Sequence, residues 1–379
     1  MKLAVPTETR SDEQRVSIVP DIAGRLVGQG VEVVVQAGAG SRAFFPDAAY
    51  EEKGAVVRAG PRETTVDADL VTKVHAPTAA EVELLPEGAT LVSFLQPAAD
   101  LDAVRSLSQR KITAFSLDLV PRISRAQSMD ALSSQATVSG YLSGLAAAVR
   151  LPKFFPLFMT AAGTVPPAKV LVLGAGVAGL QAIATARRLG AQVRAYDVRA
   201  AAKEEVQSLG ATFVELELET QEGSGGYARE QSEEFLARQR ELISNEVAVS
   251  DVVITTAAVP GRKAPVLVTT DMVERMVAGS VVVDMAADAG GNCELSEPGV
   301  DIDHNGVVVA GLTNPPSAMP THASFLYSRN VNNFLALLIQ DGELRPDFDD
   351  EIVVRSCVLR NGEVVNEAAT QLLEGKGAS

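Results

Sequence analysis

One short segment, residues 121–135, gathers several polar side chains that could hold a small-molecule ligand. Guanidinium, amide, carboxylate and hydroxyl groups can orient such a ligand through directed hydrogen bonds. The segment has no His, no Cys and no nucleophile beside a base. These side chains are therefore expected to orient a reacting group and not to transfer a proton. The candidates are Arg122, Arg125, Gln127, Asp130 and Ser133.

A glycine-rich turn further along the chain is the second candidate site. An apolar run at 169–173 precedes it, and a helix is expected after it. In such a strand–turn–helix unit the first glycine permits the tight turn, the second lets a pyrophosphate approach the backbone, and the third lets helix and strand pack closely. The helix N-terminus supplies amide donors for phosphate oxygens. The pattern predicts a dinucleotide site at Gly174, Ala175, Gly176, Val177, Ala178 and Gly179.

An acidic residue at the end of the next predicted strand indicates which dinucleotide is bound. Asp197 follows the run at 192–196, and its carboxylate can accept hydrogen bonds from both ribose hydroxyls. Its charge would repel a 2′-phosphate, so NAD(H) is predicted in preference to NADP(H). Val198 and Arg199 complete the predicted ribose-binding group, although Arg199 is a residue type that can accept a 2′-phosphate.

A similar pattern near the N-terminus, Gly38-Ala-Gly40-Ser-Arg-Ala43, also follows a predicted strand. No acidic residue ends a strand at the required distance, and Phe44-Phe45-Pro46 interrupts the helix that would be needed. The segment is therefore predicted to be a turn and not a second nucleotide site.

Strand-like and helix-like segments alternate along most of the chain. Continuous Val, Ile and Leu runs separated by helical patterns indicate a parallel sheet covered on both faces. Since 379 residues exceed what one core usually serves, we predict an α/β protein with two Rossmann-like, doubly wound parallel-sheet domains separated by a cleft. Strands are expected at 2–5, 31–35, 70–74, 89–94, 112–117, 169–173, 192–196, 212–216, 251–257, 280–284 and 306–309. Helices are expected at 20–29, 128–149 and 317–340, and a hairpin that turns at Asn361-Gly362 is expected over 352–365.

The composition excludes several classes of partner. A net charge of -15 argues against binding to nucleic acid or to an anionic membrane surface. No apolar stretch reaches the roughly 18 residues of a membrane span, so no direct membrane insertion is expected. No His, Cys or Asp residues show the spacing of metal ligands, and no metal site is predicted.

Together these motifs resemble those of the soluble NAD(H)-binding alpha subunit (its first domain) of proton-translocating NAD(P) transhydrogenase, in the alanine dehydrogenase/transhydrogenase superfamily. The resemblance is carried by 121–135, by the glycine-rich turn and by Thr160-Ala-Ala-Gly-Thr-Val-Pro-Pro-Ala168. Gly225-Gly-Tyr-Ala228 and Gly290-Gly-Asn-Cys-Glu-Leu-Ser-Glu-Pro298 also match. The resemblance implies a discontinuous N-terminal domain, 1–132 plus 318–379, an NAD(H)-binding domain at 133–317, and a homodimer.

The resemblance also implies an activity. Such subunits pass hydride from NADH to NADP+ on a partner, the NADP(H)-binding subunit, and a membrane proton-channel subunit couples the transfer to proton translocation. Arg122, Gln127, Asp130 and Ser133 would surround the dihydronicotinamide, and Tyr227 would lie at the tip of a loop that closes over the nucleotide. Thr256 and Ala257 are also expected to contact the cofactor. The implied location is cytoplasmic, peripherally associated with the inner membrane through partner subunits.

Two other functions stay open at this point. An alanine dehydrogenase-like enzyme would use Arg15, Lys73 and Asp288, but Gln96 follows the strand where that relative has a catalytic His, and oxidative deamination must remove a proton. His75 would lie on the same strand face as Lys73 and could compensate. A non-catalytic NAD(H) sensor would share the fold.

Overall fold

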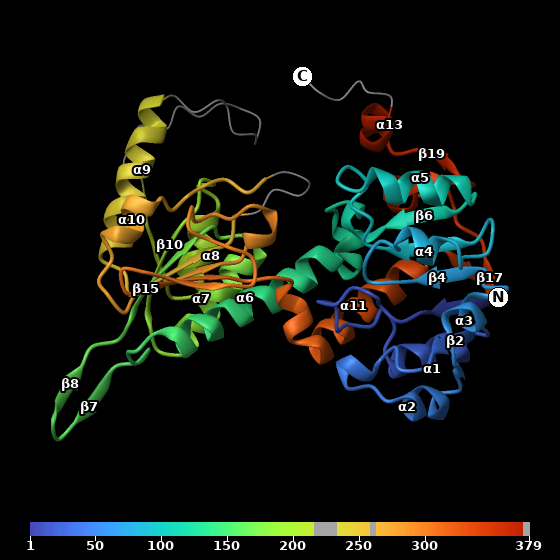
Figure 1. The fold of residues 1–379 in the computed structure, drawn as a ribbon, viewed down its shortest axis with the longest axis horizontal. Coiled ribbons are helices and arrows are strands. Elements are labelled where there is room, and N and C mark those ends of the chain that lie inside the picture. Colours follow the sequence, from blue (N-terminus) through green and yellow to red (C-terminus); the bar gives the residue numbers. More distant parts are fainter. Residues whose placement is uncertain (216–232, 258–262, 374–379) are drawn as a thin grey trace. The chain divides into compact units, whose positions relative to one another are not determined.

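The computed structural model describes residues 1–215, 233–257 and 263–373, which form two compact units (Figure 1). Unit 1 contains Met1–Gln135 and the C-terminal segment from Pro316, and unit 2 contains Ala136–Pro315. Each unit is built on a mainly parallel sheet with helices. The predicted α/β class with two parallel-sheet domains is confirmed.

Within the described residues, the sheet of unit 1 has eight strands in the order β19-β18-β6-β5-β4-β1-β2-β3. From β3 to β6 every neighbouring pair is parallel, in the 3-2-1-4-5-6 order of the Rossmann fold, and β18 and β19 extend the sheet with antiparallel pairing. The strands are β1 Lys2–Val5, β2 Glu32–Gln36, β3 Val56–Arg58, β4 Leu70–Thr72, β5 Thr90–Ser93, β6 Thr113–Ser116, β18 Cys357–Arg360 and β19 Glu363–Val364. A separate two-stranded piece consists of β16 Ile339–Gln340 and β17 Glu343–Leu344. The helices are α1 Pro20–Gly28, α2 Asp47–Glu52, α3 Pro61–Thr65, α4 Ala79–Val82, α5 Leu101–Gln109, α11 Pro320–Leu335, α12 Glu351–Ser356 and α13 Glu367–Leu373.

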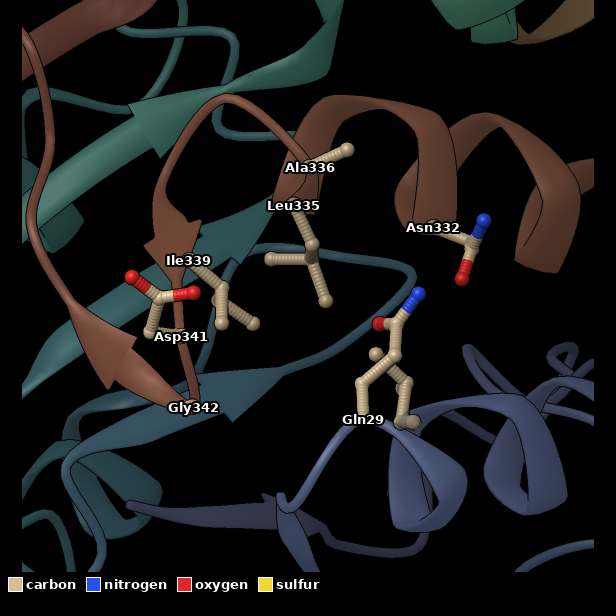
Figure 2. Close-up of a pocket in the computed structure, with 8 residues that line it drawn as sticks. Gln29, Asn332, Leu335, Ala336, Ile339, Asp341 and Gly342 are labelled. Carbon is tan, nitrogen blue, oxygen red and sulfur yellow. The ribbon is translucent and has the colours of Figure 1, made fainter.

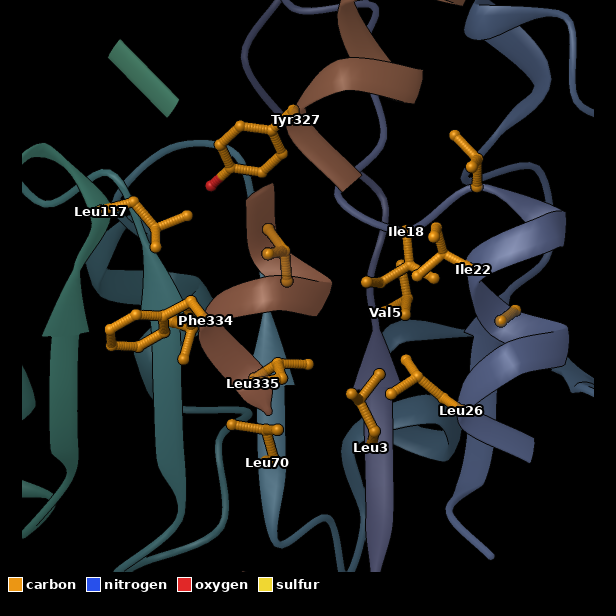
Figure 3. Close-up of a cluster of buried hydrophobic side chains, with 14 of the residues drawn as sticks. Leu3, Val5, Ile18, Ile22, Leu26, Leu70, Leu117, Tyr327, Phe334 and Leu335 are labelled. Carbon is orange, nitrogen blue, oxygen red and sulfur yellow. The ribbon is translucent and has the colours of Figure 1, made fainter. Parts of the chain in front are cut away.

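Apolar side chains cover both faces of this sheet. Successive residues of a strand point to opposite faces. Leu3 and Val5 of β1 lie in one cluster with side chains of α1 and α11 (Figure 3). Ala4 belongs to a second cluster, which includes residues of α5. Burial on both faces explains why these strands read as continuous apolar runs in the sequence.

The described sheet of unit 2 has the order β11-β10-β9-β12-β13-β15-β14, and only the β14–β15 pair is antiparallel. The chain runs from β9 to β10 on one side and continues to β12 on the other side of β9. This reversal is the place where open α/β sheets bind ligands, at the carboxyl ends of the strands. The strands are β9 Lys169–Leu173, β10 Gln192–Tyr196, β11 Thr212–Phe213, β12 Val252–Thr255, β13 Val281–Asp284, β14 Asp301–His304 and β15 Val307–Gly311. The helices are α6 Ala131–Arg150, which begins in unit 1, α7 Val177–Arg188, α8 Ala202–Ser208, α9 Glu233–Ala248 and α10 Thr270–Glu274.

The C-terminal segment differs from the prediction. The predicted turn at Asn361-Gly362 is confirmed, with positive φ at both residues. The hairpin is shorter than predicted, because α12 occupies the start of the Val-rich run. The Asp350 carboxylate accepts the Ile352 N–H at 2.8 Å and caps this helix. Ile352 is buried and Val354 exposed, so helical packing outweighs the strand preference of Val.

Other predicted bounds also need correction. The helix expected over 128–149 begins later, since the 3-10 turn η3 Ser124–Met129 precedes α6. The helix expected over 317–340 ends at Leu335, because β16 pairs with β17 beyond it. The Gly38 segment is a turn, as predicted, with φ +78° at Gly38. The hairpin of β7 Phe158–Thr160 and β8 Gly163–Val165 was not predicted.

Candidate functional site

The glycine-rich turn of unit 2 joins β9 to α7, and its three glycines have different environments. Gly174 has φ +99°, a left-handed conformation that side chains rarely adopt. A Cβ on Gly179 would lie 1.9 Å from the Gly174 carbonyl oxygen, so only glycine lets α7 pack against the turn. A Cβ on Gly176 would meet no atom within 4 Å. The open space beside Gly176, at the N-cap of α7, is where a phosphate could approach the backbone.

The end of β12 lies beside this turn. The Thr256 hydroxyl donates to the Gly174 carbonyl oxygen at 3.1 Å. A Cβ on Gly174 would lie 2.6 Å from Thr256 Oγ1. The structure therefore brings Thr256 and Ala257 to the dinucleotide turn at the carboxyl edge of the sheet, as expected for two neighbouring parallel strands.

Asn292, which the sequence analysis did not select, holds the end of β12 in place. Its side chain is fully buried. Oδ1 accepts the Ala257 N–H at 3.0 Å, and Nδ2 donates to the carbonyl oxygens of Ala257 at 2.8 Å and Pro265 at 2.7 Å. The buried Asp284 carboxylate in turn accepts the N–H groups of Asn292 at 2.7 Å and Cys293 at 2.9 Å. The paired glycines before Asn292, both with positive φ, were the signal that could have identified it.

Asp197 lies at the end of β10 and contacts the same turn. Its carboxylate accepts the Ala175 N–H at 2.7 Å. Arg199 donates to both carboxylate oxygens, from Nε at 3.0 Å and from Nη2 at 3.1 Å. Burial would raise the pKa of Asp197, but the Arg199 guanidinium and the two backbone N–H groups outweigh it and hold the pKa below its usual value. Asp197 is therefore an ionised acceptor at the site, while Val198 and the Arg199 side chain are exposed.

The polar segment of the sequence analysis lies in unit 1, where its members divide into two groups. Asp130 caps α6, because its carboxylate accepts the Ser133 N–H at 2.8 Å and the Ser133 hydroxyl at 2.6 Å. Arg125 is bound by Asp350 through two hydrogen bonds of 2.6 and 2.9 Å. Arg122 and Gln127 are exposed and have no side-chain partner among the described residues. Of this segment, Arg122 and Gln127 are the side chains available to a ligand.

A buried ion cluster occupies the positions that an alanine dehydrogenase would use. Glu13, fully buried, accepts two hydrogen bonds from Arg15 at 2.8 and 2.7 Å and lies 2.6 Å from His75 Nε2. Lys73, 2% exposed, contacts Glu81 at 2.7 Å and Glu8 at 3.3 Å. Burial alone would raise the pKa of Glu13, but hydrogen bonds from Arg15 and His75 hold it well below its usual range. Both cations therefore already have carboxylate partners.

Several other candidates offer less. Burial raises the pKa of Cys293 to about 11, which does not suit a nucleophile. In the described part of the chain, no three His, Cys, Asp or Glu side chains gather as metal ligands, and no helix is long and apolar enough to span a membrane. The predicted residue Tyr227 lies outside the described residues.

A pocket of about 300 Å³ on unit 1 lies between α1, α11 and the β16–β17 piece (Figure 2). Its one ionisable side chain, Asp341, is exposed. No group in it could act as an acid, base or nucleophile on a ligand. The lining residues are Leu26, Gln29, Asn332, Leu335, Ala336, Ile339, Asp341 and Gly342.

Comparison with known proteins identifies the family. Residues 4–139 match the N-terminal domain of alanine dehydrogenase/PNT, and residues 143–367 match its C-terminal domain. The first of the alpha-subunit chains of the Rhodospirillum rubrum NAD(P) transhydrogenase is 47% identical over 388 residues, which covers 100% of both chains. The solved transhydrogenase from Sinorhizobium meliloti has a TM-score of 0.89 at 41% identity and covers 96% of this chain and 100% of that one. A solved L-alanine dehydrogenase has a TM-score of 0.84 at 27% identity, with 100% of both chains covered. The resemblance inferred from the motifs is confirmed: the chain belongs to the alanine dehydrogenase/PNT family.

Proposed function

We propose that this chain is the NAD(H)-binding subunit of a proton-translocating NAD(P) transhydrogenase. It binds NADH at the Gly174–Gly179 turn and passes hydride to NADP+ on a separate subunit, and a membrane subunit couples this transfer to proton translocation. The observation that carries the proposal is the pairing of Arg15 and Lys73 with buried carboxylates. The chain keeps a dinucleotide turn, but the cations that would bind an organic acid are already neutralised. The hydride acceptor is therefore expected to come from a partner.

The residues of unit 2 fit NAD(H). The space beside Gly176 and the amide groups at the start of α7 can take the pyrophosphate. The ionised Asp197 can accept the ribose hydroxyls once Arg199 moves aside, and Thr256 and Ala257 line the opposite side of the turn. Bound NADH would supply the hydride from its dihydronicotinamide ring.

The protein's task in this reaction is to orient the rings. Hydride moves from NADH to NADP+ and gives NAD+ and NADPH, so no proton passes between substrate and protein. Holding the reacting atoms at roughly 3–3.5 Å and excluding water can then supply most of the catalysis. Arg122 and Gln127 have the exposure and hydrogen-bonding groups for this role. Asp130 and Ser133 would support them by fixing the start of α6.

Alanine dehydrogenase activity is the second candidate, since the chain keeps Arg15, Lys73 and Asp288. Their environments do not favour it. His75, the residue that could replace the missing base, is bound to Glu13 at 2.6 Å. The Asp288 carboxylate accepts the Asn314 N–H at 2.9 Å. Gln96, which follows β5, has no acid–base group.

The proposed assembly includes a homodimer. Phe158 and Met159 on the β7–β8 hairpin are exposed, Met159 by 78%. The exposed Phe154 and Val249 line a neighbouring groove of about 1000 Å³. Exposed apolar side chains gathered in this way are typical of protein interfaces, and a second copy of the chain is the proposed occupant. The partner subunits would hold the dimer at the cytoplasmic side of the inner membrane.

The first experiment uses the purified chain alone. After NADH binding has been established by fluorescence titration, the chain is mixed with L-alanine and NAD+ and absorbance is followed. We expect binding without NADH formation. Rapid NADH formation would instead support the dehydrogenase.

A variant separates the transhydrogenase from a non-catalytic NAD(H) sensor. Gln127→Ala should slow hydride transfer to the partner's NADP+ and leave the NADH dissociation constant unchanged. A sensor would show the opposite pattern, with weakened NADH binding and no transfer by the parent protein.

A further inference from the structure

A buried amide on α11 of unit 1 holds the segment that carries Gln127. Asn330 is 7% exposed. Its Nδ2 donates to the Ser128 carbonyl oxygen at 2.9 Å, and its Oδ1 accepts the Ser134 hydroxyl at 2.6 Å. One side chain thus joins the end of η3 to the first turn of α6. The residue enclosed by these contacts, Asp130, is the cap of α6.

A second amide strengthens this attachment. Asn333, three residues further along the same helix, donates to the same Ser128 carbonyl oxygen at 3.0 Å. A carbonyl oxygen has two lone pairs, so both acceptor positions of Ser128 are filled by α11. The backbone directly after Gln127 is therefore fixed by two side chains.

The attachment continues into the buried ion cluster. Gln135 Nε2 donates to the Ser134 hydroxyl at 3.2 Å and to the Ala323 carbonyl oxygen at 3.1 Å. Gln135 Oε1 accepts from Arg15 Nη1 at 2.8 Å, and Arg15 is bound by Glu13. A continuous series of hydrogen bonds thus runs from Glu13 to Ser128. It gives these buried charges a structural task that the hydride transfer itself does not require of them.

We propose that Asn330 is a positioning residue for hydride transfer, which fixes the Ser128–Ser134 backbone and thereby places Gln127 at the reacting rings. The inference rests on the proposed function. Gln127 is exposed and has no side-chain partner of its own among the described residues, so its position depends on the backbone beside it. Transfer between two rings is sensitive to displacements of about 1 Å. The nucleotide-binding turn, by contrast, belongs to unit 2 and makes none of these contacts.

The test compares Asn330→Ala with Asn332→Ala, a matched control on the same helix whose side chain lines the pocket of Figure 2. Each variant is combined with an NADP(H)-binding subunit, NADH and thio-NADP+, whose reduced form absorbs where NADH does not. Turnover is measured together with NADH affinity and with amide hydrogen exchange of residues 124–134. Asn333→Ala removes one of the two donors to Ser128 and is the second variant if Asn330→Ala folds poorly.

We expect Asn330→Ala to lower kcat by at least about tenfold and to leave the NADH dissociation constant within about twofold. Exchange in 124–134 should accelerate, Asn333→Ala should show a smaller change in the same direction, and Asn332→Ala should match the parent. An unchanged kcat, or a loss of NADH affinity equal to the loss of kcat, would overturn the inference while a functioning parent left the proposed function intact. A parent pair that transferred no hydride would remove the proposed function and this inference with it.

Discussion

Two glycines of the dinucleotide turn provide a paired prediction, because the structure assigns them different physical roles. In Gly179→Ala, the new Cβ would lie 1.9 Å from the Gly174 carbonyl oxygen and 2.8 Å from its carbonyl carbon. Contacts below 3.0 Å with backbone cannot persist, so α7 must move away from β9 by about 1 Å or more. Overpacking of this kind costs about 1–3 kcal/mol.

Gly176→Ala should behave differently. No atom lies within 4 Å of the new methyl group, and φ −74°, ψ −172° suits alanine. Alanine is a poorer N-cap than glycine, but it also lowers the entropy of the unfolded chain, and these effects of about 0.5–1 kcal/mol oppose each other. Stability should therefore stay nearly unchanged. The methyl group would, however, occupy the space proposed for the pyrophosphate, so NADH binding should weaken at least about tenfold.

Thermal unfolding and NADH titration of both variants test these roles. For a domain of about 150–250 residues, each kcal/mol lowers Tm by about 2–4 °C. Gly179→Ala should lose several degrees and bind NADH weakly, whereas Gly176→Ala should unfold near the parent Tm and still bind weakly. If Gly176→Ala bound NADH as tightly as the parent, the pyrophosphate would not lie at this turn.

Three further predictions concern buried polar groups. Asp197→Asn should weaken NADH binding about tenfold and reduce the preference for NADH over NADPH, and equal titration curves for parent and variant would contradict the ribose assignment. Asn292→Ala leaves the backbone groups of Ala257 and Pro265 without partners, so it should lower the free energy of unfolding by about 3 kcal/mol, and an unchanged urea midpoint would argue against that role. Glu13 has a depressed pKa, so its stabilising effect is present above the unfolded value of about 4.3 and is lost as pH falls toward the folded value. Glu13→Gln should therefore cost about 3 kcal/mol near neutral pH and flatten the acid side of the stability profile, whereas parallel profiles below about pH 4.3 would show that Glu13 does not carry this dependence.

Strands and turns with local signals could be predicted from the sequence. The apolar runs of β1 and β9 and the Asn361-Gly362 turn depend on short-range patterns, and the structure has them where they were expected. The C-terminal Val-rich run was assigned wrongly, because a cap from Asp350 and burial of Ile352 favour a helix there. The β7–β8 hairpin carries exposed apolar side chains, which resemble a buried run in sequence.

The candidate site was predictable where one motif contains both partners. The glycine-rich turn and Asp197 lie on consecutive strands, so spacing alone brought them together. Spacing could not separate ligand contacts from structural ones in residues 122–133. Arg125 pairs with Asp350, which is distant in the sequence. Asp130 and Ser133 have the three-residue spacing of a helix cap, a signal that was present but was not used.

Direct detection of hydride transfer tests the central claim. The purified chain, an NADP(H)-binding subunit, NADP+ and NADH deuterated at the transferred C4 position are combined, and the NADPH formed is analysed by mass spectrometry. The account predicts NADPH that carries the deuterium, formed only when both proteins are present. NADPH without deuterium, or none at all with NADH bound to the chain, would contradict direct transfer between the two nucleotides.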